Sequence, residues 1–193
     1  MLNNLKKYKV ILASGSPRRR ELLSGLGIDY TIKVLPDVNE AYPETLKGED
    51  IPLYIAREKA EAYLKGIESD ELIITADTIV WLDNEVLGKP TDERQAKVML
   101  RMLSGKTHHV ITGVCLTTRE FQKSFTTTTE VTFAELSKEE IDYYVEKYRP
   151  LDKAGAYGIQ EWIGFVGVEA INGSYFNVMG LPIQRLYKEL AKL

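Results

Sequence analysis

Side chains that could carry out acid–base, metal or anion chemistry are spread over several segments of the chain. Asp77 follows the apolar run 72–76, where we expect a buried strand to give way to a turn. A carboxylate at the end of a strand often lines a cleft in α/β proteins, where it can bind a divalent cation or take a proton from water. Asp77 could equally cap the turn that follows it. The residue type leaves a catalytic and a structural role open.

The strongest pattern for a ligand site lies in residues 10–23. A β-rich apolar run is followed by a turn of small residues and by Pro17, which suits the first position of a helix capped by Ser16. The unpaired N–H groups of that helix start attract anions, and Arg18 and Arg19 add full positive charge there. Because arginines at a helix start oppose the helix dipole, the pattern favours an anion site over a solvated basic turn.

Four further segments offer polar groups. Glu40 and Asp37 lie in an acidic loop, where they could help bind a cation or be solvated. Lys59 in the middle of a predicted helix and Lys89 between glycine and proline could reach into a cleft, although for each lysine taken singly an exposed surface position is favoured. Gln160 ends a loop of small residues, and its amide has the donor and the acceptor needed to read a nucleobase edge.

Composition narrows the class of protein. The 193 residues are enough for one domain, or one domain with two lobes, and 44% of them are hydrophobic. The net charge of −3 argues against a general nucleic-acid binder.

The lone Cys115 lies in an apolar run, which predicts a buried structural thiol. His108 and His109 are adjacent, so on a strand they would point to opposite faces. No apolar run is long enough for a membrane span or a signal peptide, so we expect a cytoplasmic enzyme or binding protein.

Strand and helix signals alternate, which predicts a mixed α/β fold. Predicted strands are 30–34, 72–76, a hairpin of 79–82 with 85–87 turning at Asp83 and Asn84, a long hairpin over 107–134, and a pair formed by 165–171 with 175–178. The first predicted helix begins at Pro17 and is stopped by Gly25 and Gly27, and the second covers about 52–65. A third is capped by Thr91, a fourth is opened by the capping box of Ser137 and Glu140 and has Tyr144 on its apolar face, and a last one follows Pro182.

Eight segments, in order along the chain, carry a family resemblance. They are Ala13–Leu23, Arg57–Ala60, Ala76–Val80, Gly88–Pro90, Leu103–His108, Asp152–Gln160, and Asn172–Tyr175 with Gly180–Pro182. Together they resemble the Maf (septum formation) family of nucleoside triphosphate pyrophosphatases, over nearly the whole chain. Within that family the segments resemble the branch acting on dTTP and UTP.

The resemblance implies a fold and an activity. The implied fold is α/β (mixed α+β) and inosine triphosphatase-like, with an elongated mixed sheet flanked by helices, two lobes and a central cleft, in a single domain over 1–193. The implied activity is metal-dependent hydrolysis of dTTP and UTP, or of modified pyrimidine nucleotides, to monophosphate and pyrophosphate. The implied cofactor is a divalent cation, Mg²⁺ or Mn²⁺. A homodimer is common among similar proteins, and no nucleic acid or membrane partner is expected.

The resemblance also implies residue roles. Asp77 would be the catalytic carboxylate and, with Glu40, a metal ligand. Substrate choice would be set by Arg18, Thr78 and Gln160. The phosphates would be held by Ser14, Arg19, Lys59 and Lys89.

Two other functions fit some of the same residues. A nucleotide-binding regulator of cell division that does not hydrolyse its ligand would also use the basic turn and the glycine loops. A phosphatase would release only the terminal phosphate. Carboxylates near an anion site favour hydrolysis, because a simple anion binder gains nothing from added negative charge. No nucleophile stands beside a base, so direct attack by water on the α-phosphorus is the expected chemistry.

Overall fold

The computed structural model describes residues 2–36 and 38–193 of the chain, so Asp37 lies outside the described residues. Within this part, seven strands form one sheet in the order β2-β1-β3-β5-β6-β7, and β4 pairs with β3. The strands are β1 (Lys9–Leu12), β2 (Thr31–Ile32), β3 (Glu71–Leu82), β4 (Glu85–Leu87), β5 (Thr107–Thr117), β6 (Gln122–Phe133) and β7 (Val168–Asn172). The sheet is mixed, because β1 runs parallel to β2 and β3 whereas β4 and β7 are antiparallel to their partners.

The described helices number seven, with two short 3₁₀ turns, η1 (Asn3–Lys7) and η2 (Ala154–Ala156). They are α1 (Pro17–Ser24), α2 (Asp50–Leu64), α3 (Glu93–Leu103), α4 (Lys138–Tyr148), α5 (Trp162–Gly167), α6 (Tyr175–Met179) and α7 (Ile183–Leu190). None of the described helices is both long and apolar enough to cross a membrane.

The chain divides into two compact units. Unit 1 contains Met1–Asp77, Thr112–Thr127 and Gly180–Leu193. Unit 2 contains Thr78–Ile111 and Thr128–Met179. The chain passes from one unit to the other within β3, β5 and β6, whose residues are shared between the two.

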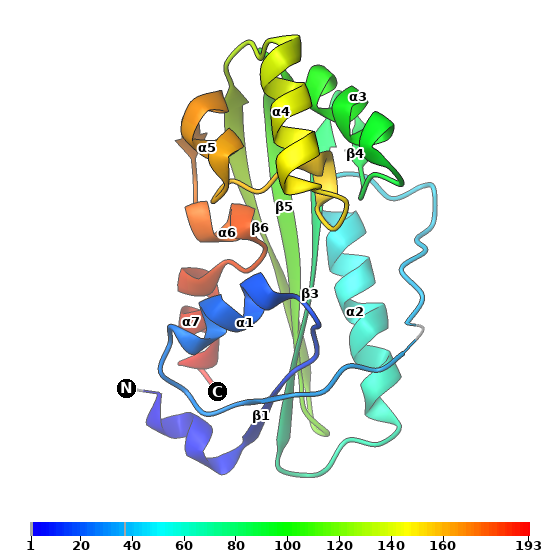
Figure 1. Cartoon of the computed structure of the whole chain (residues 1–193). Helices are drawn as coiled ribbons and strands as arrows, with labels where there is room; N and C mark the ends of the chain where they lie inside the picture. The colour runs from blue at the N-terminus through cyan, green and yellow to red at the C-terminus, as the bar shows by residue number, and fades with distance from the viewer. Residues whose placement is uncertain (1, 37) are drawn as a thin grey trace. The chain divides into compact units, whose positions relative to one another are not determined.

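In unit 1, helices cover both faces of the strands. Figure 1 shows α2 on one side of β3 and β5, with α1 and α7 on the other. The approach of α2 is close at Gly113 of β5, where an added Cβ would lie 2.3 Å from the Pro52 carbonyl oxygen. Tyr63 of α2 and Ile67, which follows the helix, form an apolar cluster with Ile11 of β1 and Ile73 of β3. Burial of this apolar surface holds α2 in place.

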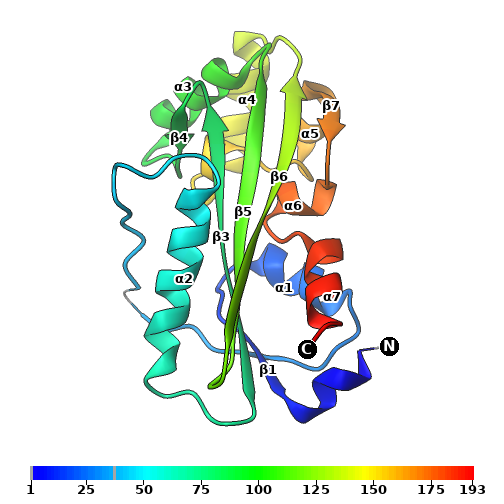
Figure 2. The same ribbon diagram turned by 180° about the vertical axis from the view of Figure 1, so that it is seen from behind.

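In unit 2, helices α3 and α4 pack together, and β7 pairs with β6 at the edge of the sheet (Figure 2). The long-range ion pair of Lys97 with Asp142 joins the two helices at 2.8 Å. Three aromatic rings, His108, Phe133 and Tyr157, stack edge to face with centroids 4.9–5.4 Å apart. This cluster anchors the segment that follows η2 to the strands.

Most local signals are confirmed. Ser16 caps α1, and the Ser137–Glu140 capping box opens α4. The hairpin of β3 and β4 turns at Asp83 and Asn84, both with positive φ, as a two-residue turn requires. The long hairpin is formed by β5 and β6, and Cys115 is buried. His108 is fully buried and the side chain of His109 is 42% exposed, as expected for opposite strand faces.

Three expectations about the elements are wrong. The strand predicted to stop at residue 76 continues through Asp77 and Thr78 to Leu82, so Asp77 lies inside a strand and not before a turn. Asp92 caps α3 in place of Thr91, because its side chain accepts a hydrogen bond from Gln95 N at 2.7 Å. The predicted pair of 165–171 with 175–178 does not form. Its residues lie in α5, β7 and α6, and β7 pairs with β6.

Candidate functional site

The turn before α1 is held by side-chain hydrogen bonds. The hydroxyl of the buried Ser14 accepts from Ser16 N at 3.2 Å, and the Ser16 hydroxyl accepts from Arg19 N at 3.4 Å. These bonds fix the direction in which the helix starts, and the helix begins with Pro17. The strand–turn–helix pattern of the sequence therefore forms, with its arginines at the start of the helix.

Arg19 reaches from α1 to two other segments of unit 1. Its Nε donates to the Gly180 carbonyl and its Nη1 to the Ala76 carbonyl, both at 2.8 Å. Burial lowers the pKa of Arg19, and the nearby charge of Arg18 adds to this effect. The fixed guanidinium connects the start of α1 to β3 at the residue before Asp77. Arg19 thus orders the surroundings of the carboxylate.

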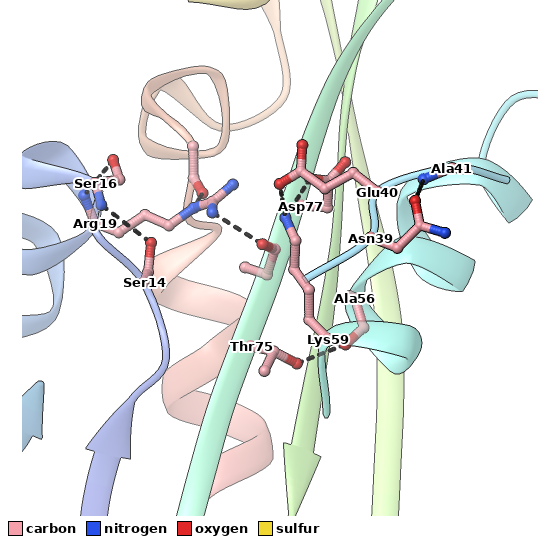
Figure 3. A network of polar contacts seen from close by, with 12 residues as sticks. Ser14, Ser16, Arg19, Asn39, Glu40, Ala41, Ala56, Lys59, Thr75 and Asp77 are labelled. Atoms are coloured by element: carbon pink, nitrogen blue, oxygen red, sulfur yellow. Dashed lines mark hydrogen bonds and ion pairs between the residues drawn. The ribbon is translucent and has the colours of Figure 1, made fainter. Parts of the chain in front are cut away.

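Asp77, Lys59 and Glu40 come together in unit 1 from a strand, a helix and a loop (Figure 3). The Lys59 Nζ lies 2.8 Å from Asp77 Oδ1 and 2.7 Å from Glu40 Oε1. The side chains of Lys59 and Asp77 are only 14% and 13% exposed, whereas that of Glu40 is 53% exposed. Two carboxylates from distant parts of the sequence therefore converge on one ammonium group.

The position of Lys59 is set by how α2 packs on β3. The Thr75 hydroxyl, buried in β3, donates to the Ala56 carbonyl of α2 at 2.7 Å. Thr75 lies two residues before Asp77, and Ala56 lies three residues before Lys59, less than one helical turn away. The bond therefore fixes the helix and the strand close to the point where the two charged side chains meet.

The donor set suits a hard divalent cation. Mg²⁺ and Mn²⁺ prefer carboxylate oxygens and commonly keep several positions for water and substrate phosphates. Among residues 2–36 and 38–193 no group of three or more His, Cys, Asp or Glu forms a metal cage. Glu40 and Asp77 both contact the ammonium group of Lys59, so their carboxylates lie close together. They fit a metal ion that is held by two protein carboxylates and takes its other ligands from substrate and water.

Three of the predicted site residues belong to unit 2. Thr78 follows Asp77 in β3, and Lys89 is exposed in the loop after β4. Next to Lys89, the Gly88 carbonyl accepts a hydrogen bond from Gly155 N at 3.0 Å. The loop that carries Lys89 is therefore bonded to the segment that leads to Gln160.

Gln160 is half-buried, and its Oε1 is buried with no hydrogen-bond partner among the described residues. A buried acceptor without a donor is unfavourable by itself, and such groups are rare in folded proteins. A ligand N–H would satisfy it. Gln160 is therefore the one predicted specificity residue for which the structure provides an unused hydrogen-bonding atom.

The sequence does not single out the residues that hold the Gln160 segment. It places Tyr144 of α4 on an apolar helix face and gives no signal for a role of Glu161. In the structure the Tyr144 hydroxyl donates to the Glu161 carboxylate, and Lys153 pairs with the same carboxylate at 3.1 Å. An apolar stripe identifies a buried tyrosine but does not show what its hydroxyl contacts.

A family profile described as "Maf-like protein" matches residues 9–193. The chain belongs to this family. Among its relatives, a protein of Phocaeicola vulgatus named dTTP/UTP pyrophosphatase is 70% identical over 193 residues, which is 100% of both chains. A protein of the same name from Bacteroides fragilis is 66% identical over the full length of both chains, and one from Flavobacterium johnsoniae is 49% identical over 98% of this chain and 97% of its own.

A solved structure shares the fold of this Maf-family chain. The structure of a HAM1 protein from Coxiella burnetii covers 96% of this chain and 100% of its own, with a TM-score of 0.52 and 13% sequence identity. At this identity the likeness concerns the fold only. The expected mixed α/β fold class is confirmed by the seven-stranded mixed sheet and its helices.

Proposed function

We propose that this protein hydrolyses nucleoside triphosphates, dTTP and UTP above all, to the nucleoside monophosphate and pyrophosphate. The observation that carries the proposal is the convergence of Asp77 and Glu40 on Lys59 within a chain of the Maf family. The relatives named dTTP/UTP pyrophosphatase support the substrate class, because they are 49–70% identical over nearly the whole chain. The sequence prediction pointed to the same reaction.

In this proposal Asp77 is the catalytic carboxylate. It orients or deprotonates the water that attacks the α-phosphorus, and pyrophosphate is the leaving group. Its side chain is largely buried, so few waters compete for its oxygens and its orientation is fixed by Lys59. No covalent intermediate is needed, because a water molecule supplies the attacking oxygen.

Glu40 and Asp77 would hold the divalent cation through one carboxylate each. Mg²⁺ or Mn²⁺, when bound, would neutralise phosphate charge and favour the ionised form of a nearby water. Lys59 lies between the two carboxylates and keeps them close together. Its ammonium group is also near enough to this position to contact a phosphate oxygen.

The triphosphate would be bound by the positive groups around the start of α1. Arg18 and the N–H groups that follow Ser14 supply charge and donors, and Arg19 keeps the helix start in place through its bonds to backbone carbonyls. The predicted phosphate ligands Ser14, Arg19, Lys59 and Lys89 are retained in the proposal. Such fixed charge stabilises the negative charge that grows on oxygen in the transition state, commonly by several kcal/mol.

Substrate choice is proposed to depend on Gln160 and Thr78, with Arg18 as a third residue by family resemblance. The unpartnered Oε1 of Gln160 supports its role in reading a base. We keep as further proposals that residues 1–193 act as one functional domain, that the protein forms a homodimer and that it works in the cytoplasm. We propose no nucleic acid and no membrane as a partner.

The products of dTTP and UTP hydrolysis test this function. The purified protein is incubated with each nucleotide and either Mg²⁺ or Mn²⁺, and the products are separated by ion-exchange chromatography. We expect monophosphate and pyrophosphate in equal amounts, and no turnover once the metal is chelated. Diphosphate with inorganic phosphate would identify a phosphatase instead. Binding without any product would favour the non-hydrolysing regulator.

A further inference from the structure

The hydroxyl of Tyr144 contacts the chain on both sides of Gln160. Tyr144 is fully buried in α4, and its hydroxyl donates to the carboxylate of Glu161, the residue after Gln160. The same oxygen accepts a hydrogen bond from Gly158 N, two residues before Gln160, at 3.0 Å. Both contacts lie within unit 2. One side-chain oxygen thereby contacts the backbone two residues before Gln160 and the side chain of the residue after it.

The Glu161 carboxylate that Tyr144 contacts has a second partner. Lys153 Nζ lies 3.1 Å from Glu161 Oε1 and 2.7 Å from Asp152 Oδ1, and the Lys153 side chain is only 9% exposed. Burial and the negative charge of Glu161 raise the pKa of Tyr144, so the phenol keeps its proton and can donate. The segment is therefore held at residues 153, 158 and 161 by a largely buried network.

The network packs closely around residue 158. A Cβ on Gly158 would lie 2.9 Å from Glu161 Cδ and 3.0 Å from Lys153 Cε, so the ends of both side chains would have to shift. A related restriction applies upstream, where Gly155 has a φ of 67° and its Cβ would lie 2.9 Å from Val80 Cγ2. Together with the hydrogen bonds of Tyr144, this packing restricts the segment that carries Gln160.

Base selection needs this kind of fixed position. Uracil and thymine share an imide N–H, which is a donor, whereas cytosine has an acceptor nitrogen at the same ring position. The Gln160 Oε1 is an acceptor that is buried without a partner among the described residues. It would gain a hydrogen bond from uracil or thymine and face a lone pair in cytosine, provided that it does not move.

We infer that Tyr144 is a positioning residue for base selection. By its hydrogen bonds with Gly158 and Glu161, it holds the side-chain oxygen Oε1 of Gln160 where that atom accepts the imide N–H of uracil or thymine. This inference rests on the proposed function, in which Gln160 reads the base. Tyr144 itself touches no substrate atom. Its removal should therefore change the ratio between substrates and not the chemistry common to all of them.

Tyr144→Phe tests the inference, with Tyr148→Phe as the matched control. Tyr148 stacks on Tyr144 from the next turn of α4, with ring centroids 5.1 Å apart, and the control substitution likewise removes one phenolic oxygen.

The measurement is kcat/KM for UTP and for CTP. We expect Tyr144→Phe to lower the preference for UTP over CTP about tenfold, the effect of about one hydrogen bond, with kcat for UTP changed less than about threefold. Tyr148→Phe should leave the preference within about twofold of wild type. An unchanged preference in Tyr144→Phe would overturn the inference.

Two additions keep the outcome decisive. If Tyr144→Phe does not fold, Glu161→Ala removes the carboxylate to which the Tyr144 hydroxyl donates and with which Lys153 pairs. We expect it to lower the preference in the same direction, and an unchanged preference would again count against the network. Calorimetric binding of the α,β-methylene analogues of UTP and CTP measures the same ratio without turnover. Failure of hydrolysis in the wild type would thus reject the proposed function, whereas failure of the binding ratio to change would reject the role of Tyr144.

Discussion

The polar groups of unit 1 and those of unit 2 differ in how they are held. In unit 1 the candidate site is made of full charges, with Lys59 paired to Asp77 and to the half-exposed Glu40. In unit 2 the Gln160 segment is held by a mostly buried network centred on the Tyr144 hydroxyl and the Glu161 carboxylate. A phosphate can be attracted by charges at a range of positions, whereas a base edge is read only by donors and acceptors at fixed positions.

The same contrast appears away from the candidate residues. In unit 1 the buried carboxylate of Glu189 is surrounded by cations, and Lys123 with Lys192 lowers its pKa to about 2. In unit 2 the fully buried His108 has no acidic partner among the described residues and contacts the Tyr157 hydroxyl at 2.7 Å. Burial and the neighbouring His109 lower the pKa of His108 to about 4. In unit 1 the buried Glu189 thus stays ionised and is neutralised by nearby lysines. In unit 2 the buried His108 stays uncharged within the aromatic cluster.

Asp77→Asn should give the largest effect, because it removes the carboxylate on which the chemistry of unit 1 depends. We expect kcat for dTTP and UTP to fall by about a thousandfold or more, as is common when a catalytic acid–base group or metal ligand is lost. Nucleotide binding, measured by calorimetry, should persist. Asp83→Asn is the control, since Asp83 lies in the exposed turn of β3 and β4 and asparagine tolerates its positive φ. Near-normal turnover by Asp77→Asn would remove Asp77 from the catalytic role.

The neutral His108 of unit 2 should make stability depend on pH. In the unfolded chain a histidine takes up a proton near pH 6.5, whereas His108 in the native protein does so only at about 4. Because the unfolded state binds the proton first, the free energy of unfolding should fall by about 3 kcal/mol as the pH drops from 6.5 to 4, and this contribution should then level off.

Urea unfolding at a series of pH values measures this effect. His108→Gln, which can still hydrogen-bond Tyr157, should remove most of the decline between pH 6.5 and 4. His109→Gln should retain it, because that side chain is 42% exposed. If wild type and His108→Gln lose stability in parallel, the buried histidine is not its source.

The starts of several helices could be predicted from the sequence, because the capping residues that mark them are neighbours in the chain. Ser16 and Pro17 mark the start of α1, and the capping box of Ser137 and Glu140 marks the start of α4. The break predicted at Asp77 is wrong for a tertiary reason. Aspartate is disfavoured in strands, but here its side chain is paired with Lys59 of α2, and the strand continues past it.

The candidate site could be predicted only in part. The residues were identified by resemblance, but the sequence did not show that Lys59 joins Glu40 to Asp77, since the three come from a loop, a helix and a strand. The network around Gln160 was missed for a similar reason. Tyr144 matched an apolar helix face, and the bond of its hydroxyl to Glu161 depends on how α4 packs on a segment that follows it in the chain.

The proposed chemistry depends on the charged cluster of Lys59, Asp77 and Glu40 in unit 1, whereas the base edge is read by Gln160 in unit 2. The most direct test compares kcat/KM for UTP and for CTP in Lys59→Met and in Gln160→Asn. Loss of the Lys59 charge should lower both values by about tenfold or more and leave their ratio within about twofold, because the triphosphate is common to both substrates. Shortening the side chain that carries the acceptor should lower the preference for UTP about tenfold. If Lys59→Met changes the ratio while Gln160→Asn leaves it as in wild type, this division of roles is contradicted.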